Sequence, residues 1–370
     1  MANTVSVVAL RQEVWGKDLY QDSIDALYFM KNGMMGKGIN NIVELKEELT
    51  KEPGDTATFG LTGKMSGDAI LGDNEAEGNE EAILSYDESV AIDQARFAVR
   101  MTGRLDEREV TYDMRKDAKD KLIIRRKEFL ERQIFLKLGG VDNVLLNDVN
   151  LVTVGAQCTW SNTPDYIPDA HEAAGTGARY LCANSSGTDA LTVADLITPG
   201  LIQKVKTKAK LASPMINPVV IDGINYYVLF VHPWQGDDLR SNATWSQAMR
   251  EAELRGKENP IFSGSLGVWG GVIVHEHEYV PFLDVSVAGN SFRGAAVGTD
   301  CLVDCFRALL CGQQAVGLVE CQNENEWVEK TFDYNNKRGV CTSIIGGLQK
   351  MMFNSKEFGV IALDTYGTAQ

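Results

Sequence analysis

The chain has 370 residues, with 51 acidic and 36 basic side chains and a net charge of −15. This negative charge disfavours indiscriminate binding to nucleic acid or to anionic membranes, and no apolar run is long enough to cross a bilayer. A hydrophobic fraction of 44% over this length predicts a folded protein of two or three compact units.

The cysteines and the first residues of the chain predict a cytoplasmic protein. The seven cysteines form no repeated framework, which is typical of a reducing compartment. Residues 1–15 lack a basic start followed by a long apolar stretch, so we expect no secretory signal.

Residues 1–50 predict an N-terminal arm with one or two short helices. Between Lys17 and Gly33 one helical face is repeated, and Gly33 ends the pattern. The residues of that face are Leu19, Ser23, Ala26, Leu27 and Met30. A helix this short cannot bury its face alone, so we expect a neighbouring surface to cover it.

Residues 51–85 are rich in Gly, Asp, Glu and Asn and poor in large apolar side chains. A structureless loop of this length is uncommon inside a compact domain, so the segment predicts a long two-stranded flap that reaches onto a partner. A surface loop is the alternative. Tyr86–Gly103 then alternates apolar and polar residues, which predicts a strand returning from the flap.

Residues 104–138 contain neither Pro nor Gly and predict one long helix of about 50 Å. The apolar stripe at the helical period consists of Val110, Met114, Ala118, Leu122, Phe129 and Ile134. Residues 100–137 carry 12 basic and 8 acidic side chains, so this segment is basic within an acidic chain. A rod of this length needs a long surface to cover it, and we expect neighbouring copies to supply that surface. A helix lying on its own domain is the alternative.

The centre of the chain mixes helices and strands, which is typical of an α+β or α/β fold. Leu191–Leu211 has a helical pattern interrupted at Pro199, and Asp237–Leu254 predicts a second helix. Gly223–Pro233 predicts a strand, and so does Gly270–Pro281. From Phe306 onward, apolar segments are expected to return and complete a core.

Two of the four histidines lie in the stretch "GGVIVHEHEYVP". On a strand His275 and His277 share one face, while Glu276 and Glu278 share the other. That geometry suits two ligands of a zinc site, and His171 or His232 would have to complete it. No third ligand has a matching spacing, so we favour a structural role. The alternative is a metal-dependent enzyme that uses His275 and His277.

Several longer stretches resemble the major capsid proteins of tailed phages, in the branch of the coliphage N-four type. They are "GDTATFGLTGKMSG", "AEGNEEAIL", "SVAIDQARFAVRMTGRLDERE", "YYVLFVHPWQGDDLR", "NPIFSGSLGVWGGVIVHEHEYVP" and "FRALLCGQQAVGLVE". They run in the family's order from about Gly54 to the C-terminal "FGVIALDTYG" and so cover most of the chain.

The resemblance implies an α+β fold of the Hong Kong 97 type with five parts. These are an N-terminal arm (1–50), an extended loop with its return strand (51–100), a peripheral domain with a spine helix (101–148), an axial domain (149–328) and C-terminal strands that return to the peripheral domain (329–370). Residues 150–192 match poorly and are expected to be an insertion.

The resemblance also implies a function without catalysis, cofactor or metal. Copies of the chain would form pentamers and hexamers that close into an icosahedral shell around packaged double-stranded DNA. The partners implied are the chain itself, portal and scaffolding or decoration proteins, and DNA by non-specific proximity, with no membrane. The location implied is the virion capsid, assembled in the host cytoplasm. An encapsulin-like nanocompartment shell is the alternative within this architecture.

Assembly contacts are expected on the extended loop and on the long helix. Carboxylates and phosphates repel, so an acidic shell protein avoids adhering to dense DNA. We expect the basic helix to face the lumen or the acidic loop of a neighbour. The residues expected to make assembly contacts are Phe59, Lys64, Asp68, Arg104, Arg125, Arg126 and Lys127.

Overall fold

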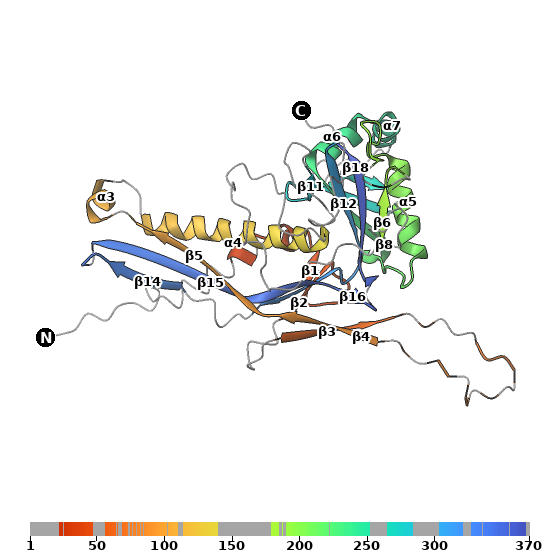
Figure 1. Ribbon diagram of the computed structural model, residues 1–370, viewed down its shortest axis with the longest axis horizontal. Coiled ribbons are helices and arrows are strands. Elements are labelled where there is room, and N and C mark those ends of the chain that lie inside the picture. The colour runs from red at the N-terminus through yellow and green to blue at the C-terminus, as the bar shows by residue number, and fades with distance from the viewer. Residues whose placement is uncertain are drawn as a thin grey trace.

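The computed structural model describes residues 22–24, 26–46, 56–63, 85–101, 103–109, 114–139, 179–184, 190–221, 223–251, 265–283, 303–320, 327–334, 336–354 and 356–367, with scattered positions from 65 to 83 and at 187. Figure 1 shows an elongated unit, built from long strands and one long helix, joined at one end to a compact unit with shorter helices. Each unit has its own sheet.

The elongated unit is built on a six-stranded sheet. Its central strand, β15 (Lys337–Lys350), has 14 residues and pairs antiparallel with three neighbours. These neighbours are β5 (Asp93–Arg100), β13 (Val316–Glu320) and β14 (Trp327–Phe332). The parallel strands β2 (Val43–Lys46) and β1 (Met35–Gly36) extend the sheet beyond β13.

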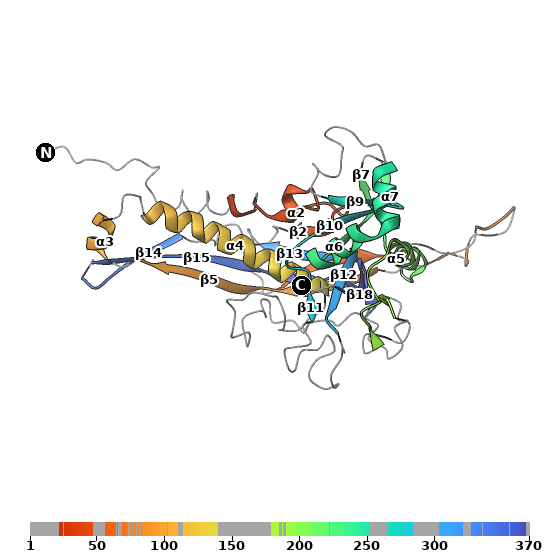
Figure 2. The same cartoon turned by 90° about the horizontal axis from the view of Figure 1, so that it is seen from above.

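Helix α4 (Met114–Gly139) lies along β15 and β5 and is about 39 Å long (Figures 1 and 2). The predicted apolar stripe forms its buried face at Ala118, Leu122 and Ile134. The surface that covers the helix thus belongs to the same chain, and the expectation that neighbouring copies supply it was wrong. An apolar stripe predicts that a helix is covered but carries no information on which chain covers it.

The single helix expected over residues 104–138 is two helices. α3 (Arg104–Glu109) is separate from α4, and residues 110–113 lie outside the described part of the chain. From Leu130 to Gly139, α4 is buried on all sides, because the compact unit covers the side that the long sheet leaves open.

The compact unit is built on an eight-stranded sheet. The strand order is β6 (Tyr180–Cys182), β18 (Val360–Tyr366), β12 (Cys305–Cys311), β8 (Ile224–Val231), β10 (Val272–Glu276) and β9 (Ser265–Trp269). Beside this path, β11 (Phe282–Leu283) pairs with β12, and β7 (Val219–Ile221) pairs with β8.

Both faces of this sheet are buried, which explains the continuous apolar run of β8. On one face Leu229 and Val231 join a core with the helices α5 (Pro199–Leu211), α6 (Pro233–Ser241) and α7 (Ala243–Glu251) (Figures 1 and 2). On the other face Phe230 lies edge-on to Phe135 of α4, with 5.4 Å between ring centroids. Successive residues of a strand point to opposite faces, so β8 contributes to two cores.

Two boundaries of the predicted helices were wrong for local reasons. Pro199 begins α5 instead of interrupting a helix, because Thr198 caps the N-terminus and proline is tolerated in the first turn. The helix expected over Asp237–Leu254 is two helices, α6 and α7, with Asn242 between them. The Asn242 side chain accepts a hydrogen bond from Thr244 N, 3.0 Å away, and so opens α7.

The described part of residues 1–50 contributes to the core of the protein. The helix α2 (Tyr28–Lys31) and the strand β2 lie inside the protein, and Leu27, Phe29 and Val43 are fully buried. As expected, the short helix is covered by a neighbouring surface, which here is the rest of its own chain. The expected stop at Gly33 is confirmed, since this glycine adopts φ +65° directly after the helix.

The C-terminal part of the chain contributes strands to both units. β13 belongs to the long sheet, although β12, which precedes it, lies in the compact unit. β18 lies between β6 and β12 in the compact unit, although β14 and β15 before it belong to the long sheet. The chain thus crosses between the units at Gly312 and again at Gly359, and Gly312 N–H donates a 2.8 Å hydrogen bond to Gly359 O.

A two-stranded hairpin, β3 (Thr56–Thr62) and β4 (Ser85–Ala91), projects from the junction of the units (Figure 1). It confirms the predicted two-stranded flap, and β5 confirms the return strand. A second small hairpin pairs β16 (Met352–Phe353) with β17 (Lys356–Glu357). Among the described residues no helix has both the length and the apolar character needed to span a membrane.

Candidate assembly surfaces

The extended hairpin has a buried base and an exposed tip. At the base Phe59 is fully buried in a cluster with Val90, Val319 and Met351. Toward the tip every described position from 65 to 83 is exposed, including Leu71 at 75% and Ile83 at 65%. The base is therefore part of the subunit, whereas the tip presents apolar side chains to water.

The expected contact residues of the hairpin divide accordingly. Phe59 presents no surface to a neighbour, because its ring is enclosed by its own chain and Lys46 Nζ lies 4.7 Å from its centre. Lys64 and Asp68 lie outside the described residues.

The basic helix α4 also divides into inner and outer cations. Arg126 is fully buried and bound to Glu320 of β13, so it fastens the helix to the sheet and presents nothing to a neighbour. Arg125 and Lys127 keep 47% and 34% of their side chains exposed and pair with Glu128 and Glu131 on the same helix. The backbone of Arg104 is in α3, and its side chain lies outside the described part.

The two histidines of the HEH motif share one face, as predicted. The Tyr28 hydroxyl lies 2.8 Å from His275 Nδ1, and the Tyr28 ring lies 4.7 Å from the His277 ring. Tyr279 N–H donates to His277 Nδ1 at 3.1 Å. On the opposite side Glu276 pairs with Arg240 at 2.8 Å.

This histidine cluster joins the N-terminal segment to both units. Tyr28 N–H donates to Glu131 of α4 at 2.6 Å, and the His277 ring packs against Phe135, with 4.5 Å between centroids. Burial lowers the pKa of His275 to about 4. Burial, helped by the charge of Lys127, lowers the pKa of His277 to about 4 as well. Both imidazoles are therefore neutral at pH 7 and serve as packing groups.

The zinc alternative gains no third ligand among the described residues, which hold no group of three side chains able to bind a metal. His232 caps α6, where its Nδ1 accepts a hydrogen bond from Trp234 N–H, and its ring packs on Phe306. His171 lies outside the described part.

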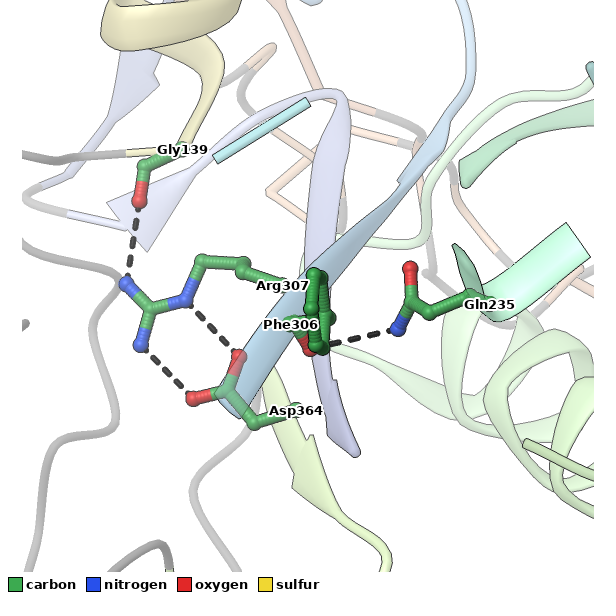
Figure 3. Close-up of polar contacts among 5 residues, drawn as sticks. All are labelled: Gly139, Gln235, Phe306, Arg307 and Asp364. Carbon is green, nitrogen blue, oxygen red and sulfur yellow. Dashed lines mark hydrogen bonds and ion pairs between the residues drawn. The ribbon is translucent and has the colours of Figure 1, made fainter. Parts of the chain in front are cut away.

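A second buried ion pair joins the C-terminal end of α4 to the compact unit (Figure 3). Arg307 of β12 donates two hydrogen bonds of 2.8 Å to the carboxylate of Asp364 on β18 and one of 3.1 Å to Gly139 O. Beside it, Gln235 of α6 donates to Phe306 O at 3.2 Å. These bonds therefore hold α4, the strands β12 and β18, and the covering helix α6 together at one point.

The compact unit carries a basic surface that no local pattern in the sequence predicts. Helix α5 contains Lys204, Lys206, Lys208 and Lys210 and no acidic residue. Because the four lysines alternate along the chain, they show no helical stripe in the sequence. The fold brings Lys356, about 150 positions away, beside Lys204 and Lys208 at the rim of one groove.

Comparisons with known proteins all indicate one kind of protein. A family model described as phage capsid protein matches residues 13–369. The major capsid protein of Pseudomonas phage KPP25 is 28% identical over 362 residues, which cover 95% of this chain and 94% of that protein.

The fold is similar to that of solved capsids over its whole length. The capsid of Ralstonia phage GP4 is 27% identical with a TM-score of 0.77, covering 100% of this chain and 95% of that chain. The capsid asymmetric unit of cyanophage Pam1 is 23% identical with a TM-score of 0.70, covering 100% of both chains.

Proposed function

We propose that copies of this chain build a phage head as pentamers and hexamers around double-stranded DNA. The chain belongs to the phage capsid protein family and is a major capsid protein of an icosahedral phage head. Its α+β fold is of the Hong Kong 97 type. It is a structural protein of the virion and not an enzyme.

The exposed tip of the extended hairpin is the observation that carries the proposal. Ile70, Leu71 and Ile83 are large apolar side chains that water surrounds in the single chain. Contact with a neighbouring copy would remove them from water, at a gain of about 25 cal/mol for each Å² buried. A segment that projects from the body is suited to this contact, because it reaches a neighbour without displacing its own core.

The peripheral and axial roles of the two units are part of the proposal. We assign the peripheral role to the elongated unit with α4 and the axial role to the compact unit. Arg125 and Lys127 remain candidates for assembly contacts, since their side chains reach the surface. The net charge of −15 supports a non-specific relation to the packaged DNA, held near the shell without tight binding.

Portal and scaffolding or decoration proteins complete the proposed set of partners, as the family resemblance implies. Within the family we propose the branch of the coliphage N-four type, supported by the ordered stretches from Gly54 to the C-terminus.

Electron microscopy of the purified chain tests the central proposal. We expect uniform closed particles or the rings of five and six that precede them. A chain that stays monomeric over a wide range of concentration and salt, with and without the other head proteins of its phage, would contradict the proposed assembly.

A further inference from the structure

One face of helix α5 borders an open groove of about 830 Å³. Lys204, Lys208 and Leu211 of the helix line it, and so do Ser213, just after the helix, and Lys356 of β17. Leu211 exposes 80% of its surface at one end of this α5 groove. A smaller cavity of about 330 Å³ shares Ser213 and Lys356 and continues the groove to the base of the extended hairpin.

The positive charge of the α5 groove is not neutralised within the described part of the chain. Lys206 and Lys208 donate to the backbone carbonyl groups of Gly270 and Tyr180. No ion pair joins Lys204 or Lys356 to a carboxylate among the described residues. Burial also lowers the pKa of Lys208, so a carboxylate placed beside it would stabilise the charged form.

Helix α4 differs in this respect, although it is the more basic segment by count. Five of its cations already have carboxylate partners within the chain. These cations are Arg115, Lys119, Arg125, Arg126 and Lys127. The α5 groove is therefore the better receptor for an anionic partner.

The chain itself contains a segment of matching chemistry. Residues 65–84 hold six carboxylates and no lysine or arginine, and apolar pairs flank the acidic stretch at Ile70–Leu71 and Ile83–Leu84. The described positions of this tip are all exposed, so the tip does not fill the groove of its own subunit. Apolar and acidic groups in this order complement a groove with Leu211 at one end and lysines along its sides.

We propose that the α5 groove of one subunit receives the acidic tip, residues 65–84, of the extended hairpin of a second copy. The inference rests on the proposed capsid function and names the receptor for the hairpin. Each subunit carries both halves of the contact, tip and groove, so the contact is head-to-tail. Such contacts close into rings when the rotation between copies divides a full turn.

Reversing the charges of the groove, of the tip, and then of both together tests whether the groove lysines bind the carboxylates of the tip. The groove variant Lys204→Glu/Lys356→Glu is expected to need about tenfold more subunit for assembly, since it removes two exposed ion pairs. The loop variant Glu77→Lys/Glu80→Lys is expected to show a similar loss, and the combination of all four changes to restore assembly. Lys210→Glu is the matched control, because Lys210 is an exposed lysine of α5 that does not line the groove.

Assembly is measured by sedimentation and microscopy at two salt concentrations. Normal assembly of the groove variant, or a loss that the loop variant does not restore, would overturn the inference and leave the capsid function intact. Groove-variant shells that form normally but retain less DNA would show that the groove binds phosphates instead. A wild-type chain that never assembles would refute the proposed function itself.

A disulfide trap gives a second readout that does not depend on the yield of particles. Lys204→Cys combined with Glu77→Cys is expected to give a ladder of linked subunits under oxidising conditions, whereas Lys210→Cys with Glu77→Cys is not. A product closed only within one chain would contradict a contact between copies.

Discussion

The Arg126 guanidinium on α4 donates to the Glu320 carboxylate on β13, and at most 1% of either side chain is exposed. The flanking residues Arg125 and Lys127 point outward. Three consecutive basic residues therefore serve two purposes: one holds the helix on the sheet, and two face the surroundings.

Arg126→Glu is expected to destabilise the unassembled chain by about 3–5 kcal/mol, because it leaves two carboxylates buried together. Arg125→Glu is expected to cost less than about 1 kcal/mol, because its pair is exposed. Urea unfolding below the concentration needed for assembly measures both. Equal effects of the two substitutions would show that Arg126 is not the internal anchor.

Asp364→Asn is expected to lower the free energy of unfolding by about 3–5 kcal/mol, since Arg307 would stay buried without a countercharge. The double variant Arg307→Met/Asp364→Leu is expected to recover most of this loss, because it removes both charges from the core. Calorimetric melting of the unassembled chains distinguishes the two. A double variant as unstable as the single one would mean that the bond from Arg307 to Gly139 is essential.

Gly347→Ala is expected to destabilise the chain by more than about 2 kcal/mol. Its added methyl group would overlap the backbone oxygen of Ala91, where β15 crosses the end of β4. Gly60→Ala in β3 is the matched control, since its methyl group meets no atom within 4 Å. Thermal unfolding compares the two, and an equally tolerated Gly347→Ala would show that β15 and β4 separate easily.

Acidification is expected to destabilise the subunit through its buried histidines. His275 and His277 titrate near pH 4 in the folded chain and near 6.5 when unfolded. Between these pH values the unfolded state binds protons that the folded state does not. The free energy of unfolding therefore falls as pH is lowered from 6.5 to 4, by about 1.4 kcal/mol per pH unit for each histidine.

His277→Phe is expected to reduce the pH dependence of the free energy of unfolding by the contribution of one histidine, about 1.4 kcal/mol per pH unit. Tyr28→Phe is the control, because it removes the hydroxyl near His275 without removing an imidazole. Urea unfolding at several pH values between 4 and 7 gives the slopes. A slope that is the same in wild type and His277→Phe would mean that His277 is already charged in the folded chain.

The base and the tip of the extended hairpin are expected to respond differently to truncation. Phe59→Ala removes a fully buried ring and is expected to cost about 3–5 kcal/mol of folding stability. Leu71→Ser changes an exposed side chain and is expected to leave folding within about 0.5 kcal/mol while reducing assembly. Parallel measurements of unfolding and of particle yield test this. Normal assembly of the Leu71→Ser chain would show that the hairpin tip does not take part in the contact between copies.

Local patterns predicted the elements well but not their partners. The stripe of α4, the strand with His275 and the two-stranded flap all follow from periodicity over a few turns or residues. That α4 lies on its own β15, or that β18 inserts beside β12, depends on contacts between distant segments. An apolar run such as "FGVIALD" states that a strand is buried on both faces but does not identify its neighbours.

The candidate surfaces likewise depend on contacts between distant segments, which local sequence patterns do not predict. Charge counting singled out the segment around Arg125, yet ion pairs within the chain neutralise much of that charge. The groove at Lys204 escaped notice because Lys356 joins it only through the fold. The local sequence of a basic residue does not reveal whether a carboxylate from a distant strand will neutralise it.

The double crossing at Gly312 and Gly359 has a mechanical consequence. The two connections lie side by side and are hydrogen-bonded to each other. An added methyl group would strike the Asn217 backbone at Gly312 and the Gln313 backbone at Gly359, so both connections are closely packed. A force on the far end of the long sheet therefore reaches the compact unit partly through two adjoining connections that are hydrogen-bonded to each other.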